Sequence, residues 1–153
     1  MLIKKDQDVI LSYFSDKSNL QGGHAEAVYF PESVDDLLVL MKDANNNALP
    51  LTISGTGTGT TGGRIPFGGA VVAMEKFKGI NNFSADKRTV EVLPGTTLAE
   101  LDDFLRPLGY IYPPDPTEAT AQLGATIANN SSGAQSYKFG ATRNWVDGLK
   151  IVL

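Results

Sequence analysis

The residues best suited to binding chemistry lie in one short segment, 53–64, which reads ISGTGTGTTGGR. Seven of the chain's 16 glycines fall between positions 55 and 69. Glycine lets a backbone approach a ligand closely, successive N–H groups can form a nest for phosphate oxygens, and threonine hydroxyls add further donors. The alternative is a flexible surface loop, which would order many glycines at an entropic cost without a compensating ligand. The segment therefore predicts a phosphate cradle.

Two common phosphate motifs do not account for this segment. A Walker loop requires Gly-Lys-Ser/Thr, and no lysine lies between Lys42 and Lys76. Gly57, Gly59 and Gly62 match the spacing of a dinucleotide fingerprint, but that fingerprint must open a helix. Here RIPFGG follows at residues 64–69, so the match is interpreted as accidental.

A second candidate segment, 129–133, reads NNSSG. Taken alone it is typical of an ordinary turn. It directly follows GATIA at residues 124–128, and small residues beside Asn and Ser side chains suit a flat cofactor and a diphosphate. This position favours a binding role.

Composition narrows the class of protein. The 153 residues are 42% hydrophobic and 20% charged, with no cysteine, one histidine and a net charge of −4. Cysteine chemistry, multi-histidine metal centres and general nucleic-acid binding are thereby disfavoured, and no metal site is expected. His24 lies in a polar loop and is interpreted as a solvated residue. Without a signal-like start or a long apolar run, we expect a cytoplasmic protein with no transmembrane segment.

The elements that must position these segments alternate between helix and strand. Apolar spacing predicts helices over 8–14, after Ser33 with Asp36 as its capping-box partner, and after Thr97 with Glu100. Strands are predicted at 27–31, 50–54, 70–74, around Phe83, at 89–93 and at 149–153. The first two strands and the helix between them form a parallel β–α–β unit, and an antiparallel element follows. Gly109 is expected to stop the third helix, and PPDP at 113–116 to form a rigid loop.

Four blocks in this order resemble the FAD-binding domain of the vanillyl-alcohol oxidase/p-cresol methylhydroxylase flavoproteins. They read VYFPESVDD from 28, SGTGTGTTGG from 54, VLPGT from 92 and PPDPTEATAQLGATIANNSSGAQSYKFGAT from 113. Within that family the chain resembles the glycolate oxidase and D-lactate dehydrogenase group. The resemblance implies an α+β fold with two subdomains, 27–77 and 78–153, after an N-terminal helix and loop at 1–26. Because family enzymes continue into a cap domain, the second subdomain is expected to be incomplete and the fold truncated.

The resemblance also implies three sets of FAD contacts. The first, the cradle of the diphosphate, comprises Ile53, Ser54, Gly55, Thr56, Gly57, Thr58 and Gly59. The second comprises Pro114, Asp115, Ala121, Gln122, Gly124 and Ala125, and the third comprises Asn130, Ser131, Ser132 and Gly133. Thr58 stands where members with covalent FAD carry histidine, so noncovalent FAD is expected. Ser54 in place of arginine and Ala125 in place of glycine depart from the family pattern.

The implied function is the FAD-binding portion of an oxidoreductase that oxidises a 2-hydroxy acid by hydride transfer to FAD. The alternative is a non-catalytic module that binds FAD or a nucleotide and needs a partner or a cap domain. A third possibility, a peptidoglycan-precursor reductase of the same fold, would need catalytic groups further along the chain. Catalytic residues are not assigned, and a hydroxy acid is expected to bind only with the missing C-terminal region. Apolar residues at 151–153 would favour self-association if left uncovered.

Overall fold

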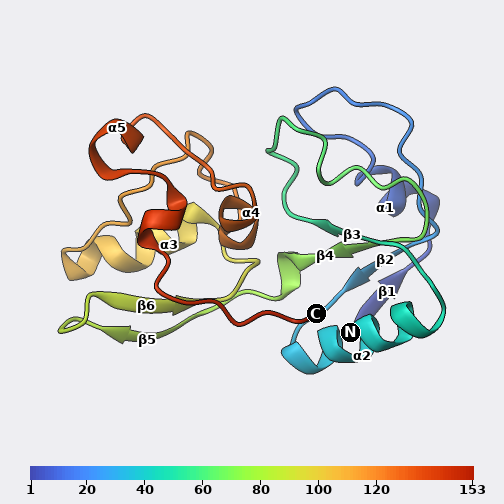
Figure 1. Ribbon diagram of the computed structural model, residues 1–153, viewed down its shortest axis with the longest axis horizontal. Helices are drawn as coiled ribbons and strands as arrows, with labels where there is room; N and C mark the ends of the chain where they lie inside the picture. The colour runs from blue at the N-terminus through green and yellow to red at the C-terminus, as the bar shows by residue number, and fades with distance from the viewer. The chain divides into compact units, whose positions relative to one another are not determined.

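The computed structural model describes residues 1–153, and the chain divides into two compact units (Figure 1). The first unit contains Met1–Phe77 together with Ile151–Leu153, and the second contains Lys78–Lys150. Residues 1–26 belong to the same unit as the strands that follow them. Each unit has its own hydrophobic cluster and is described by itself below.

A four-stranded sheet forms the centre of the first unit, in the order β1-β2-β4-β3. Its strands are β1 (Leu2–Lys4), β2 (Ala27–Phe30), β3 (Leu51–Ser54) and β4 (Ala70–Ala73). The strand β1, which the sequence pattern did not predict, is antiparallel to β2, whereas β2 and β3 both run parallel to β4. The predicted β–α–β unit is therefore parallel, but β4 lies between its two strands. All four β4 residues are buried, as expected for a central strand.

Helix α2 (Val34–Asn46) connects β2 to β3 and begins as predicted at Ser33, whose side chain accepts a hydrogen bond from the Asp36 N–H at 3.1 Å. The expected return bond of a capping box is replaced. The Asp36 carboxylate accepts from the N–H of Glu32 at 2.9 Å and lies 3.3 Å from the ammonium group of Met1. The Glu32 hydrogen bond is the main cause that lowers the pKa of Asp36.

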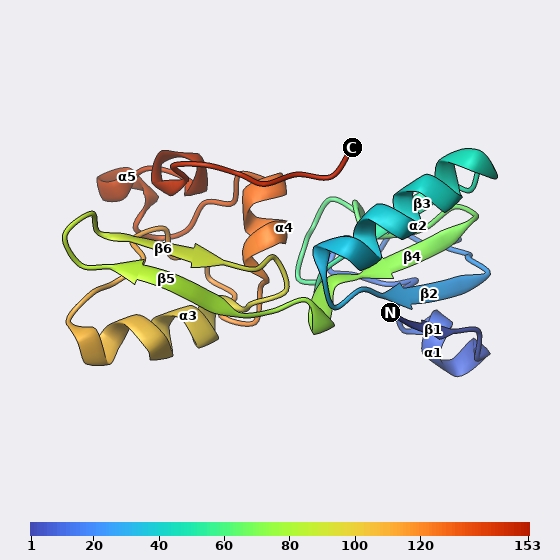
Figure 2. The same ribbon diagram turned by 90° about the horizontal axis from the view of Figure 1, so that it is seen from below.

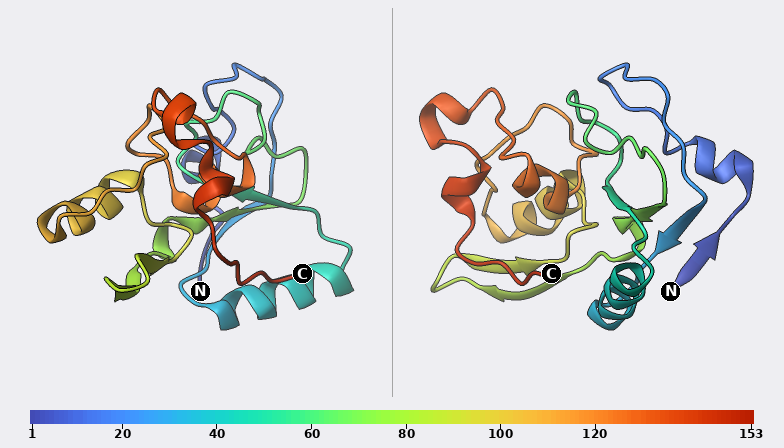
Figure 3. Two further views of the ribbon diagram at one scale, coloured as in Figure 1. Left: turned by 60° about the vertical axis from the view of Figure 1, so that its left-hand side comes forward. Right: turned by 45° about the vertical axis from the view of Figure 1, so that its right-hand side comes forward.

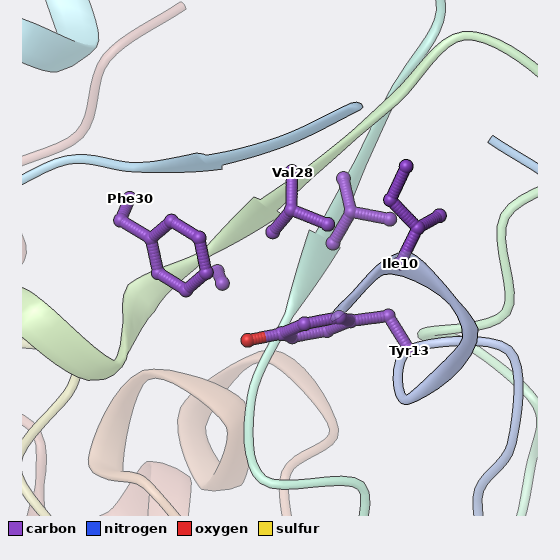
Figure 4. Close-up of a cluster of buried hydrophobic side chains, with 6 residues drawn as sticks. Ile10, Tyr13, Val28 and Phe30 are labelled. Atoms are coloured by element: carbon purple, nitrogen blue, oxygen red, sulfur yellow. The ribbon is translucent and has the colours of Figure 1, made fainter. Parts of the chain in front are cut away.

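The core of the first unit lies between the sheet and the N-terminal segment (Figure 4). Helix α1 (Gln7–Leu11) ends three residues before the predicted end, because residues 12–14 form a turn. Ile10 and Tyr13 nevertheless pack on Val28 and Phe30 of β2, with the Tyr13 and Phe30 rings edge to face at 6.2 Å. Helix α2 lies on the other side of the sheet from α1 (Figure 3). The 3-10 turn η1 (Met74–Lys76) follows β4.

An antiparallel hairpin packed on a helix forms the core of the second unit (Figure 2). Strands β5 (Ile80–Ser84) and β6 (Thr89–Val92) pair, and helix α3 (Leu98–Leu105) buries its apolar face against them. The predicted capping box of Thr97 and Glu100 is present. After the 3-10 turn η2 (Arg106–Leu108), Gly109 takes a φ of +80° and ends the helical run as predicted.

Three short helical elements in the second unit were not predicted: α4 (Leu123–Ala128), α5 (Ser136–Phe139) and η3 (Thr142–Trp145). Their small and polar residues give no apolar periodicity over so few positions. The strand predicted at 149–153 is wrong, because those residues form no ladder with any strand of the structure. Isolated apolar residues define a strand only when another strand accepts their backbone hydrogen bonds.

Candidate functional site

The glycine loop leaves β3 at the end of a parallel strand, which is where ligands bind in many open α/β sheets. The Ser54 side chain, 1% exposed, donates from its hydroxyl to the carbonyl oxygen of Gly55 at 3.1 Å. Ile53, the residue before Ser54 in β3, is exposed. Gly57 has a φ of +78°, a conformation that a β-branched residue resists. The first predicted site set therefore starts on a fixed strand end and continues into a loop that requires glycine.

The middle of the loop leaves backbone donors available for a ligand. The backbone N–H groups of Gly57, Thr58 and Gly59 donate to no backbone carbonyl of the structure. A Cβ placed on Gly59 would meet no heavy atom within 4 Å, so the space beside it is open. Thr56 lies in the same exposed stretch. Unengaged N–H groups beside an open space are what phosphate oxygens require.

Arg64 closes the loop and was not singled out by sequence reasoning. Its guanidinium donates to the carbonyl oxygens of Gly55 at 3.2 Å and Ser12 at 3.0 Å. Burial lowers the pKa of Arg64, while the nearby Tyr13, Asp16 and Glu75 act in the opposite direction. The available signal was weak: one basic residue at the end of a glycine run.

The second and third predicted sets lie together in the second unit. Gly133 approaches the chain so closely that a Cβ would lie 1.5 Å from the carbonyl oxygen of Asp115. Gly124 likewise packs on Pro94, where a Cβ would lie 2.7 Å from the proline Cβ. Pro114, which precedes Asp115 in the chain, is fully buried. Both glycines are therefore required by the approach of two backbone segments, whatever ligand is present.

The small-residue helix α4 fixes the loop that follows it. Ala121 and Gln122 are buried before the helix, and Ala125 is half-buried within it. The N–H of Ser131 donates to Thr126 at 2.8 Å, and the Ser131 carbonyl accepts from the Thr142 hydroxyl at 2.8 Å. The NNSSG segment is therefore held on both sides.

The side chains of this loop differ in their availability. Asn130 has a φ of +46°, and its side-chain oxygen accepts from the N–H of Arg143 at 3.1 Å. Ser132 is exposed, whereas Ser131 is half-buried. Asp115 is exposed and its carboxylate accepts from the Gln135 amide at 3.2 Å. Ser132 is therefore the most accessible hydroxyl of the third set.

Neither a cluster of metal ligands nor a helix that could span a membrane is found in the structure. It contains no group of three or more His, Cys, Asp and Glu side chains that could hold a metal ion. Its helices are all too short or too polar to cross a bilayer. His24 is exposed, and its ring lies edge to face against Phe67 at 6.4 Å.

Known proteins resemble this chain in sequence and in fold. Residues 25–153 match the FAD binding domain family. The chain is 33% identical over 122 residues to a D-lactate dehydrogenase of Anaerostipes hadrus, covering 79% of this chain and 26% of that protein. It is 31% identical over 149 residues to a D-2-hydroxyglutarate dehydrogenase of Stutzerimonas stutzeri, covering 96% of this chain and 32% of that protein. The crystal structure of an alkyldihydroxyacetonephosphate synthase superposes with a TM-score of 0.81 at 21% identity, over 91% of this chain and 28% of that one.

The chain belongs to the FAD-binding domain of the vanillyl-alcohol oxidase/p-cresol methylhydroxylase family. The resemblance to its D-lactate dehydrogenase group is confirmed, as is the mixed α and β FAD-binding fold. The chain spans about a quarter to a third of the length of the two dehydrogenases.

Proposed function

We propose that this chain is the FAD-binding portion of a flavin-dependent oxidoreductase that oxidises a 2-hydroxy acid of the D-lactate or glycolate type. The observation that carries the proposal is the glycine loop after β3, with unengaged N–H groups at 57–59 and open space at Gly59. The names of the two dehydrogenase relatives support the substrate class. Bound FAD supplies the hydride acceptor.

The residues of the first set would bind the diphosphate. The N–H groups of Gly57, Thr58 and Gly59 donate to phosphate oxygens, while buried Ser54 holds the start of the loop. Threonine at position 58 offers no imidazole for a bond to the flavin, so the cofactor would be noncovalent and dissociable.

The second and third sets would contact the rest of the cofactor. The close backbone approaches at Gly124 and Gly133 fix the course of both segments. Ser132 is exposed there, and we assign it as a hydrogen-bond donor to FAD. All seventeen residues of the three sets are proposed to contact FAD.

The alternative is a non-catalytic module that binds FAD or a nucleotide and needs a partner or a cap domain. The exposed position of the single histidine favours it. Both functions share the same loop, and they differ in whether substrate is oxidised.

The proposed partners are FAD and, once a substrate-binding region is present, a small hydroxy acid. The proposed location is the cytoplasm.

Ile151 and Leu153 are exposed apolar residues of the first unit, and we propose self-association through them. Sedimentation at several protein concentrations tests this, with Ile151→Ser expected to shift the distribution towards monomer. An unchanged distribution would contradict the assignment.

The loop assignment is tested by titrating FAD into the chain and following flavin fluorescence. We expect saturable binding, with all flavin released to the filtrate after acid denaturation. Gly57→Val should abolish binding, because its side chain would enter space occupied by the Arg64 guanidinium and resist a φ of +78°. Gly148→Val is the matched control, since a Cβ there meets nothing within 4 Å. Equal affinity of parent and Gly57→Val would show that the loop is not the binding site.

A further inference from the structure

Arg64 joins two segments that are distant in sequence. One guanidinium nitrogen, Nη1, donates to the carbonyl oxygen of Gly55 in the glycine loop, 9 residues away. The other, Nη2, donates to the carbonyl oxygen of Ser12, the residue that follows α1, 52 residues away. Both acceptors are backbone atoms, so the contact fixes the course of the chain rather than the position of another side chain.

The N-terminal segment places an aromatic ring against this guanidinium. The Arg64 Cζ lies 5.1 Å from the centroid of the Tyr13 ring. Tyr13 is 7% exposed, belongs to the core of the first unit, and donates from its hydroxyl to the Glu75 carboxylate at 3.3 Å. An aromatic face fixed at both ends restricts the orientation of the cation that lies over it.

The glycine loop is shaped around the same guanidinium. A Cβ on Gly57 would lie 2.2 Å from Nη1 of Arg64, so the guanidinium occupies the space that a side chain would need. A second link lies further along, where the N–H of Lys17 donates to the carbonyl oxygen of Gly59 at 3.1 Å. The segment 12–17 therefore contacts both ends of the stretch 55–59.

The guanidinium also leaves one buried donor unsatisfied, and its two hydrogen bonds offset this cost. Its Nε is buried and has no hydrogen-bond partner in the structure. A buried unsatisfied N–H is rare in folded proteins and destabilises them. The side chain keeps this arrangement because the two Nη groups reach two carbonyl oxygens at once, a geometry that the single ammonium of lysine cannot reproduce.

We propose that Arg64 is a positioning residue that fixes loop 55–59 on the N-terminal segment 12–17 before any ligand arrives. The N–H groups of Gly57, Thr58 and Gly59 are then held ready for phosphate oxygens, and binding loses less affinity to ordering the loop. The identity of the ligand as FAD rests on the proposed function. The order of the loop does not, because it can be measured without FAD.

The test compares the parent chain with Arg64→Met, Arg64→Lys and the control Arg106→Met. Arg106 is an exposed arginine in the second unit that pairs with Asp102. Amide hydrogen exchange, followed by mass spectrometry without FAD, reports on peptides covering 12–17 and 55–59, and titration gives the Kd for FAD.

Arg64→Met is expected to raise exchange in both peptides and to raise the Kd about tenfold, which corresponds to about 1.4 kcal/mol. Arg64→Lys retains the charge but lacks the planar fork that holds the two carbonyl oxygens, so exchange should still rise in at least one of the two peptides, with a smaller rise in Kd. Arg106→Met should match the parent in every measurement.

The proposal is overturned if Arg64→Met leaves exchange in 55–59 at the parent level, or if Arg64→Lys behaves as the parent in both peptides and in Kd. The second result would show that charge alone is sufficient. If Arg64→Met loses its far-UV dichroism, Arg64→Lys decides the matter. A parent chain that binds no FAD contradicts the proposed function, while the exchange measurements still decide the role of Arg64.

Discussion

Two glycines of the predicted FAD-contact sets are required by close packing, whatever ligand binds. Gly133 is part of a predicted FAD-contact set, yet its identity is already required by the Asp115 carbonyl that lies where a Cβ would be. The same holds for Gly124 against Pro94. Sequence reasoning located these positions through family resemblance, but close approach of two backbone segments 18 residues apart leaves no periodic trace in the sequence.

Gly133→Ala should therefore destabilise the second unit with or without FAD. The methyl group would lie 1.5 Å from the Asp115 oxygen, so the backbone must move, at a cost of about 3 kcal/mol. Thermal unfolding of the FAD-free chain measures this. Gly148→Ala, at an open position, should change stability by less than about 0.5 kcal/mol. Equal melting of the two variants would show that the contact is not rigid.

Tyr13 should make the first unit sensitive to alkali. Burial, followed by the nearby Glu75 carboxylate, raises its pKa to about 12. An unfolded tyrosine ionises near pH 10, so its stabilising contribution is complete below about pH 10 and is lost as the pH rises towards 12. The stability difference between the parent and Tyr13→Phe, measured by urea unfolding, should shrink by about 2 kcal/mol between pH 9 and pH 11.5. A difference that is constant with pH would show that the hydroxyl is not buried.

At the scale of elements, the sequence pattern predicts correctly the features that depend on residues close together in the chain. The caps at Ser33 and Thr97, the helical spacing of α2 and α3 and the stop at Gly109 each depend on residues within a few positions, and each was predicted. Insertion of β4 between β2 and β3 depends on pairing between distant segments, so no local pattern predicts it. Strand β1 and the failure of 149–153 to form a strand have the same cause. An edge segment becomes a strand only if another edge accepts it.

The cap of α3 can be tested at this scale. The Thr97 hydroxyl accepts from the N–H of Glu100 at 3.2 Å, and the Glu100 carboxylate accepts from the N–H of Thr97 at 2.9 Å. Thr97→Ala removes one half of the box and should cost about 1 kcal/mol. Faster amide exchange in 98–105 would report it. Thr117→Ala, at an exposed loop position, is the control and should leave that exchange unchanged.

At the scale of the whole molecule, the predicted FAD contacts fall in both compact units, the glycine loop in the first and the other two sets in the second. All three sets are predicted from family resemblance, and their contact with FAD stays a prediction. Family resemblance did not identify Arg64, which joins the residue after α1 to the glycine loop. A residue that acts by joining distant segments becomes visible only when the fold is known.

The last prediction concerns catalysis by this chain. Oxidation of a 2-hydroxy acid needs a positioned base as well as a flavin. The single histidine is exposed beside Phe67, and the chain spans about a quarter to a third of the dehydrogenases it matches. We therefore expect dye reduction with D-lactate, D-2-hydroxyglutarate or glycolate and excess FAD to proceed no faster than with free FAD.

The Gly57→Val variant is the control for that assay, because it should keep the fold of the second unit while losing the cofactor loop. Turnover above the free-flavin rate that disappears in Gly57→Val would show that the chain alone assembles an active site, and the base would then have to be sought among its carboxylates. If neither the parent nor Gly57→Val reduces the dye faster than free FAD, while the parent binds FAD saturably, cofactor binding is separated from substrate oxidation. The loop would then be assigned to the cofactor, and proton abstraction to residues outside this chain.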